Sequence, residues 1–168
     1  MSSARASGGG LSTLDLDRTI FPELRGGSLS VRIAATDDER DAAQALRYRV
    51  FYEEMGATGN PEARLLKRDI DEFDAVADHL LVIDNAIASD ARGVVGTYRL
   101  VQSEAAAKIG RFYSSSEYDI TPLQEFPGRL LEVGRSCVDK NYRGRTAMQL
   151  LWRGIASYIF LHRIDLLF

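Results

Sequence analysis

Apolar and polar positions follow two periods along this chain, and each period predicts a different kind of element. Alternation with a period of two, together with short apolar runs, predicts strands over residues 29–34, 79–83, 93–101 and 130–138. Helical spacing of apolar residues predicts a helix from Thr36 to about Gly56, a short helix over 103–108 and a long helix over 146–161. A last apolar run covers residues 164–168.

The ends of the chain differ from its middle. Residues 1–28 contain serine, glycine and scattered charge without sustained periodicity, so we predict a disordered leader there and one domain over 29–168. Residues 56–70 are predicted to form a long loop, a length typical of function or mobility. The chain stops within its last apolar run, so we expect the domain to be incomplete at its C-terminal strand.

Composition narrows the classes of protein to which this chain can belong. It has 168 residues, of which 45% are hydrophobic and 27% charged, as in ordinary globular domains. No apolar run is long enough to cross a bilayer, and the net charge of −3 argues against general nucleic-acid binding. The single cysteine, Cys137, rules out an intramolecular disulfide and favours a reducing compartment, so we expect a cytoplasmic protein.

The stretch from Arg129 to Thr146 carries the clearest chemical signal. Glu132 and Arg135 lie three residues apart on a predicted strand, so they point to opposite faces unless a bulge intervenes. The strand runs into a basic turn in which Gly144 stands just before a helix, where backbone N–H groups can bind a phosphate. Together these features indicate a phosphate-binding acyltransferase site that acts on a thioester.

Four motifs follow one another at residues 46–51, 70–74, 96–100 and 132–135. They resemble the successive motifs of the acyl-homoserine-lactone synthases and of their relatives in the GNAT superfamily, the ornithine–acyl carrier protein N-acyltransferases. Residues 110–119 and 143–152 resemble the ornithine branch, and Ala57 stands where the signal synthases carry a tryptophan. The resemblance covers roughly residues 40–168. It implies an α/β (α+β) fold with a GNAT-like mixed central β-sheet flanked by helices.

The same resemblance implies an activity. The enzyme would move a (3-hydroxy)fatty acyl group from acyl carrier protein to the α-amino group of ornithine, giving lyso-ornithine lipid. The donor would be the phosphopantetheine arm of the carrier, with no cofactor or metal bound by the enzyme, and the lipid product would bring peripheral membrane contact. Two alternatives stay open: an acyl-homoserine-lactone synthase, which needs a pocket for S-adenosylmethionine, and a non-catalytic module that binds acyl carrier protein.

Glu132 and Arg135 are the predicted catalytic residues. Glu132 would take a proton from the attacking ammonium, directly or through water. The other interpretation is a plain ion pair that holds the sheet to Arg47 or Arg99.

Ornithine requires carboxylates for its side-chain ammonium and a guanidinium for its carboxylate. Asp71 and Asp74, with Arg99 and Arg47, meet that requirement, although most acidic runs are solvated surface. The motif resemblance adds Phe51 to this set of substrate-binding candidates.

The acyl donor has its own candidate residues. The resemblance implies that its phosphate binds at Arg143, Gly144, Arg145 and Thr146; the alternative is a capped helix start with solvated arginines. Three aromatic residues are candidates for the wall of the acyl pocket, or equally for a satellite core under a long loop: Phe112, Tyr113 and Phe126.

Other reactive side chains have structural interpretations. His79 and His162 are far apart and neither has a partner at ligand spacing, so no metal site is predicted. Cys137 is predicted to pack rather than to act as a nucleophile, which favours direct attack by the amine. Core positions predicted from helical spacing in the last helix are Leu150, Leu151, Trp152 and Ile155.

Overall fold

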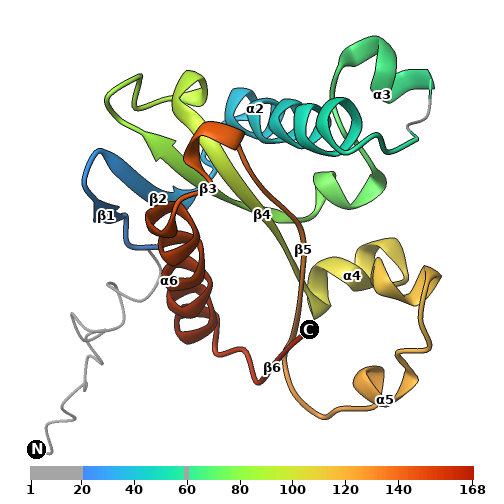
Figure 1. Cartoon of the computed structure of the whole chain (residues 1–168). Helices are drawn as coiled ribbons and strands as arrows, with labels where there is room; N and C mark the ends of the chain where they lie inside the picture. The colour runs from blue at the N-terminus through green and yellow to red at the C-terminus, as the bar shows by residue number, and fades with distance from the viewer. Residues whose placement is uncertain (1–20, 59–60) are drawn as a thin grey trace, which may run out of the picture.

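A six-stranded sheet forms the centre of the protein and separates two groups of helices (Figure 1). The computed structural model describes residues 21–58 and 61–168. The strands lie in chain order, antiparallel from the first to the fifth, and the sixth runs parallel to the fifth. They are β1 (Leu24–Gly26), β2 (Leu29–Ile33), β3 (Asp78–Asp84), β4 (Val94–Gln102), β5 (Leu130–Val138) and β6 (Leu166–Leu167).

Helices cover both faces of this sheet (Figure 1). The α-helices are α2 (Asp37–Tyr48), α3 (Pro61–Leu66), α4 (Ser103–Ile109), α5 (Thr121–Gln124) and α6 (Arg145–His162). A π-helix, η1 (Arg49–Glu54), continues α2, and short 3₁₀ turns are η2 (Glu72–Ala75), η3 (Ala91–Gly93), η4 (Ser114–Ser116) and η5 (Lys140–Tyr142). The predicted mixed sheet flanked by helices is therefore confirmed.

The two-residue period of β3 divides the core between the helices. Leu80 and Val82 pack in one buried cluster with residues of α6, whereas Leu81 and Ile83 pack in another with residues of α2. Thr36 begins α2 as predicted, because its side chain accepts a hydrogen bond from the Glu39 N–H at 3.3 Å.

A β-bulge interrupts the pairing of β4 with β5. Thr97 pairs with Cys137, but Arg99 pairs with Gly134, so β5 carries one residue more than β4 over this interval. Arg135 lies in the bulge with a φ of 52°, in the left-handed region. The extra residue changes which β5 side chains share a face.

Three expectations from the sequence need correction. Strand β1 falls within the predicted leader: it pairs with β2 across a turn in which Gly27 has a φ of 65°, and three residues are too few to show a period. Residues 1–20 of that leader lie outside the described part of the chain. The predicted loop over 56–70 contains α3. Trp152 is 52% exposed, unlike its buried helix neighbours, because one face of α6 has no partner element in the described structure.

Among the described residues, no helix is long and apolar enough to cross a membrane.

Candidate active site

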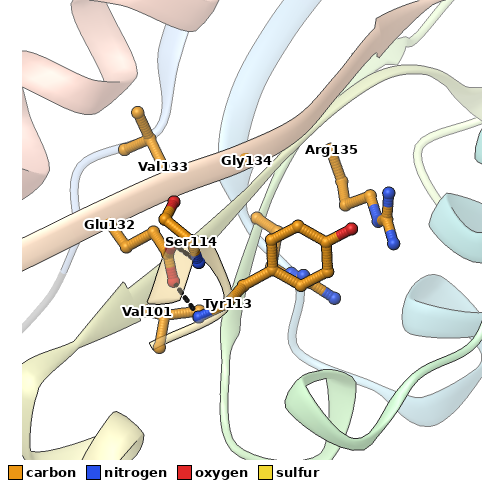
Figure 2. A pocket seen from close by; sticks show the side chains of 8 residues that line it. Val101, Tyr113, Ser114, Glu132, Val133, Gly134 and Arg135 are labelled. Carbon is orange, nitrogen blue, oxygen red and sulfur yellow. Dashed lines mark hydrogen bonds between the residues drawn. The ribbon is translucent and has the colours of Figure 1, made fainter. Parts of the chain in front are cut away.

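A cavity of about 190 Å³ lies beside the bulge of β5 (Figure 2). Residues of β4, β5 and the turn after α4 form its walls: Arg99, Val101, Tyr113, Ser114, Glu132, Val133, Gly134 and Arg135. Gly134 has open space where a side chain would project, so the backbone of β5 itself borders the cavity.

The bulge brings the two predicted catalytic residues to one face of the sheet. Residues three apart on a regular strand point to opposite faces, but the extra residue restores the side-chain direction. Both side chains reach the same neighbour: the Glu132 carboxylate accepts the Tyr113 N–H, and the Arg135 guanidinium lies 4.8 Å from the centre of the Tyr113 ring. Because the bulge lies between them, Glu132 and Arg135 can serve one site.

Glu132 is held by backbone groups rather than by the guanidinium groups of Arg47 or Arg99. Its Oε2 accepts the Tyr113 N–H at 2.8 Å and its Oε1 accepts the Ser114 N–H at 2.6 Å. The residue is only 4% exposed. The alternative interpretation, an ion pair with Arg47 or Arg99, is therefore not what the structure shows, because the carboxylate accepts hydrogen bonds from a turn. The role of Glu132 as general base stays a prediction.

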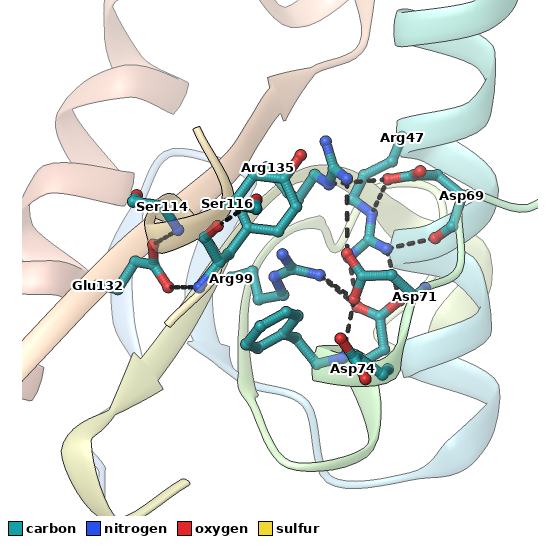
Figure 3. A network of polar contacts seen from close by, with 12 residues as sticks. Arg47, Asp69, Asp71, Asp74, Arg99, Ser114, Ser116, Glu132 and Arg135 are labelled. Atoms are coloured by element: carbon teal, nitrogen blue, oxygen red, sulfur yellow. Dashed lines mark hydrogen bonds and ion pairs between the residues drawn. The ribbon is translucent and has the colours of Figure 1, made fainter. Parts of the chain in front are cut away.

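Three arginines and three aspartates form an ion network behind the cavity (Figure 3). They come from α2, β4 and β5 and from the segment that enters β3. The members are Arg47, Arg99 and Arg135 with Asp69, Asp71 and Asp74. Equal numbers of opposite charges let this network sit against the apolar core.

Arg47 and Asp74 form the buried centre of the network. Asp74 accepts from both terminal nitrogens of Arg47, at 2.8 and 2.7 Å, and Arg47 Nε lies 2.9 Å from Asp69 Oδ2. Burial would raise the pKa of Asp74, but the hydrogen bonds and charge of Arg47, with the charge of Arg99, outweigh it and lower that pKa. Asp74 therefore stays ionised although it is 4% exposed, beside an Arg47 that is 0% exposed.

Asp71 and Arg135 are the more accessible members of the network, and Arg99 is buried beside them. Arg99 Nη1 lies 2.5 Å from Asp71 Oδ1, and Asp71 Oδ2 lies 3.5 Å from Arg135 Nη2. The Asp71 side chain is 23% exposed, and Arg99 lines the cavity. Of the four charged residues predicted to bind ornithine, Asp71 is partly exposed to solvent and Arg99 lines the cavity, whereas Arg47 and Asp74 are buried against each other.

Phe51 lies on η1, apart from the cavity at the bulge. It borders a separate pocket of about 310 Å³ with Tyr52, Met55 and Ala57, and Arg135 is shared by the two pockets. Tyr52 donates a hydrogen bond to Asp69 Oδ1 at 2.9 Å, so η1 is tied to the ion network.

One of the four predicted phosphate-binding residues is engaged by other contacts, and the other three lie at the start of α6. Arg143 forms an ion pair with Glu54 and donates from Nε to the Val138 carbonyl at 3.1 Å, so its side chain is engaged. Arg145 and Thr146 are exposed in the first turn of α6, after Gly144 at the N-cap. Within the described part of the chain no side chain caps this helix start, so its first N–H groups fit the oxygens of a phosphate.

The three residues predicted to form the wall of the acyl pocket lie in different environments. Tyr113 lines the cavity, but Phe112 packs in the core with its ring 5.2 Å from that of Phe168. Phe126 is 38% exposed and lies outside the cavity. The sequence did not indicate Ser114, because its contribution is a backbone N–H, which any residue type supplies.

Cys137 and the two histidines have environments that fit their predicted structural roles. Burial raises the pKa of the Cys137 thiol to about 12, and the residue packs against α2. His79 is buried on β3, and burial lowers its pKa. His162 ends α6, with its ring 4.1 Å from that of Tyr158. Within the described residues, no group of His, Cys, Asp and Glu side chains could hold a metal ion.

Comparisons with known proteins agree with this architecture. Residues 46–153 match the domain family described as acetyltransferase (GNAT) domain. The L-ornithine N(alpha)-acyltransferase of Rhizobium meliloti (strain 1021) is 50% identical over 144 residues, covering 84% of this chain and 49% of that protein. The enzyme of the same name from Rhodobacter capsulatus is 46% identical over 142 residues, covering 84% and 55%. The chain thus spans about half the length of the curated relatives it matches.

Two solved structures share the fold. FeeM, an N-acyl amino acid synthase from uncultured soil microbes, has a TM-score of 0.57 and 21% identity, covering 82% of this chain and 68% of its own. The AHL synthase LasI has a TM-score of 0.56 and 17% identity, covering 82% and 70%.

Proposed function

This chain belongs to the acetyltransferase (GNAT) domain family, and we propose that it provides the acyl-transfer site of an L-ornithine N(alpha)-acyltransferase. The observation that carries the proposal is the cavity at the bulge of β5, where Arg99, Glu132 and Arg135 meet beside the ion network. The relatives' names support the acyl acceptor, and the site supplies charges of both signs for an amino acid with a side-chain ammonium.

The proposed reaction is direct attack of the α-amino group on a thioester. The nitrogen forms a bond to the carbonyl carbon and the carbon–sulfur bond breaks. Of the two protons that the α-ammonium loses, one is released and one ends on the thiol. A Cys137 thiol with a pKa of about 12 is a poor nucleophile, which supports transfer without an acyl-enzyme.

Acyl carrier protein is the proposed donor, and its phosphopantetheine arm carries a single phosphodiester. The uncapped start of α6, with Arg145 exposed beside it, would hold that phosphate. Arg145 also lines a groove of about 580 Å³ with Arg153 and Trp152 along α6. These cations, which form no ion pair with the described residues, suit an acidic carrier, whose encounter they would steer. The proposal includes a cytoplasmic reaction at a membrane surface that receives the lipid product.

The test is detection of the product by mass spectrometry. The complete protein is incubated with 3-hydroxyacyl carrier protein and ornithine, and N(alpha)-acylornithine is expected. Norvaline, which has the same carbon chain without the side-chain ammonium, is the matched control and should be a poor acceptor. Acyl-homoserine lactone formed from S-adenosylmethionine would contradict the proposal in favour of a signal synthase, and no product from any amine would favour a non-catalytic carrier-binding module.

A further inference from the structure

The segment Tyr113–Ser114 forms one wall of the cavity and is fastened to β5 through its backbone N–H groups and through the Tyr113 ring. Both backbone N–H groups of this segment donate to one carboxylate, that of Glu132, at 2.8 and 2.6 Å (Figure 2). The 3₁₀ turn η4 begins at Ser114 with no side-chain cap of its own. Glu132, nineteen and eighteen residues further along the chain, is therefore the group that satisfies this turn.

The fastened segment brings the Tyr113 ring close to two arginines of the site. The Arg135 guanidinium carbon lies 4.8 Å from the ring centre, and that of Arg99 lies 5.4 Å from it. The Phe73 ring meets Tyr113 edge-on at 5.9 Å. Both guanidinium groups gain from contact with the ring face, so the position of Tyr113 and the directions of the two arginines depend on each other.

From these contacts we propose that Glu132 is a positioning residue, which acts through the Tyr113–Ser114 segment, and that Tyr113 is a specificity-determining wall of the cavity. Both oxygens of Glu132 already accept backbone hydrogen bonds, so its carboxylate is engaged in holding the segment. The kinetic part of this inference rests on the proposed function; its structural part does not.

The Glu132→Gln variant distinguishes a positioning residue from a general base. A carboxylate offers two acceptor oxygens, whereas an amide offers one oxygen and one NH₂ group, which would face a backbone N–H donor. Glu132→Gln should therefore release one end of the segment. Glu117→Gln is the matched control, since Glu117 is exposed in the same turn and does not line the cavity.

Hydrogen exchange tests the structural part without any substrate. In Glu132→Gln, the amides of Tyr113 or Ser114 should exchange at least about tenfold faster than in the wild type, while the β5 amides and the melting temperature change little. The Glu117→Gln variant should exchange like the wild type. Unchanged protection of both amides in folded Glu132→Gln would overturn the inference, whatever the protein acylates.

A double-mutant cycle tests the kinetic part. Glu132→Gln and Tyr113→Ala should each lower kcat/KM by about ten- to a hundredfold, the scale of a small misplacement in a site, and together by little more than either alone. The pH dependence of kcat/KM should keep its shape, and Tyr113→Phe should keep most activity because the ring makes the contacts. Additive losses would contradict the coupling of Glu132 to Tyr113. Loss of one limb of the pH profile in Glu132→Gln would make Glu132 the base. Either result would overturn the inference.

Tyr113→Ala keeps the inference testable if Glu132→Gln does not fold. An unchanged kcat/KM in folded Tyr113→Ala would overturn the role of Tyr113 as a wall. Absence of product from the wild type with any acceptor would contradict the proposed function instead, and the hydrogen-exchange result would still decide the role of Glu132.

Discussion

Removing the charge of Asp74 should destabilise the fold far more than it changes substrate binding. Asp74→Asn keeps the size of the side chain but replaces the carboxylate that pairs with Arg47, which is 0% exposed, by a neutral amide with one acceptor oxygen. The variant also weakens the contact of Arg99 Nη1, 3.5 Å from Asp74 Oδ1. The network would then hold three cations and two anions.

The magnitude follows from the burial of the pair. Breaking a buried ion pair by removing one partner costs about 3–5 kcal/mol, because the remaining charge is left without compensation. Native stability is about 5–15 kcal/mol, so this is a large fraction of it. For a chain of this size, each kcal/mol shifts the melting temperature by roughly 2–4 °C, so a fall of about 6–20 °C is expected.

Urea unfolding followed by circular dichroism measures this loss. Asp90→Asn is the matched control, since Asp90 forms an ion pair with Arg92 at 2.8 Å on the open surface. The unfolding midpoint of the control should stay near that of the wild type. A loss below about 1 kcal/mol in Asp74→Asn, on the scale of a surface pair, would refute the assignment of Asp74 to the structural centre of the network.

The pH dependence of stability gives a second measurement on the same residue. The pKa of Asp74 is lowered in the folded protein, since Arg47 and Arg99 outweigh the effect of burial. A lowered pKa contributes stability that is present above the unfolded value of about 3.9 and is lost as pH falls through the folded value. Asp74→Asn should therefore flatten the loss of stability in acid.

Three further results are expected. Asp71→Asn should raise the KM for ornithine several-fold with little change in that for the acyl donor, because this carboxylate is partly exposed and contacts two arginines that line the cavity; equal effects in initial-rate measurements would refute that role. Arg145→Glu with Arg153→Glu should raise the KM for acyl carrier protein and weaken its salt dependence, whereas Arg143→Gln should change it less, because Arg143 is engaged by Glu54; equal shifts would contradict this ranking. Cys137 should react slowly with a thiol reagent at pH 8 until the protein unfolds, and rapid labelling of the native protein would contradict a pKa of about 12.

Local periods in the sequence were enough to identify most of the elements. The strand predicted over 130–138 has those bounds in the structure, and the helix predicted over 146–161 is α6, Arg145–His162. Such elements can be predicted because a period of two or 3.6 records which side of a strand or helix is buried. The motif resemblance likewise led to the GNAT family, since residue types at fixed spacing survive in one dimension.

The partners of the site residues depended on the tertiary structure. The bulge that brings Glu132 and Arg135 to one face is a mismatch between two strands, so neither strand shows it alone. The pairing of Arg47 with Asp74 joins α2 to a segment twenty-seven residues later. Two candidate substrate ligands therefore form a buried ion pair that supports the fold. A carboxylate or guanidinium is the same chemical group in a structural ion pair as in a binding site. Only its neighbours and its access to solvent distinguish the two, and both are set when distant segments pack together.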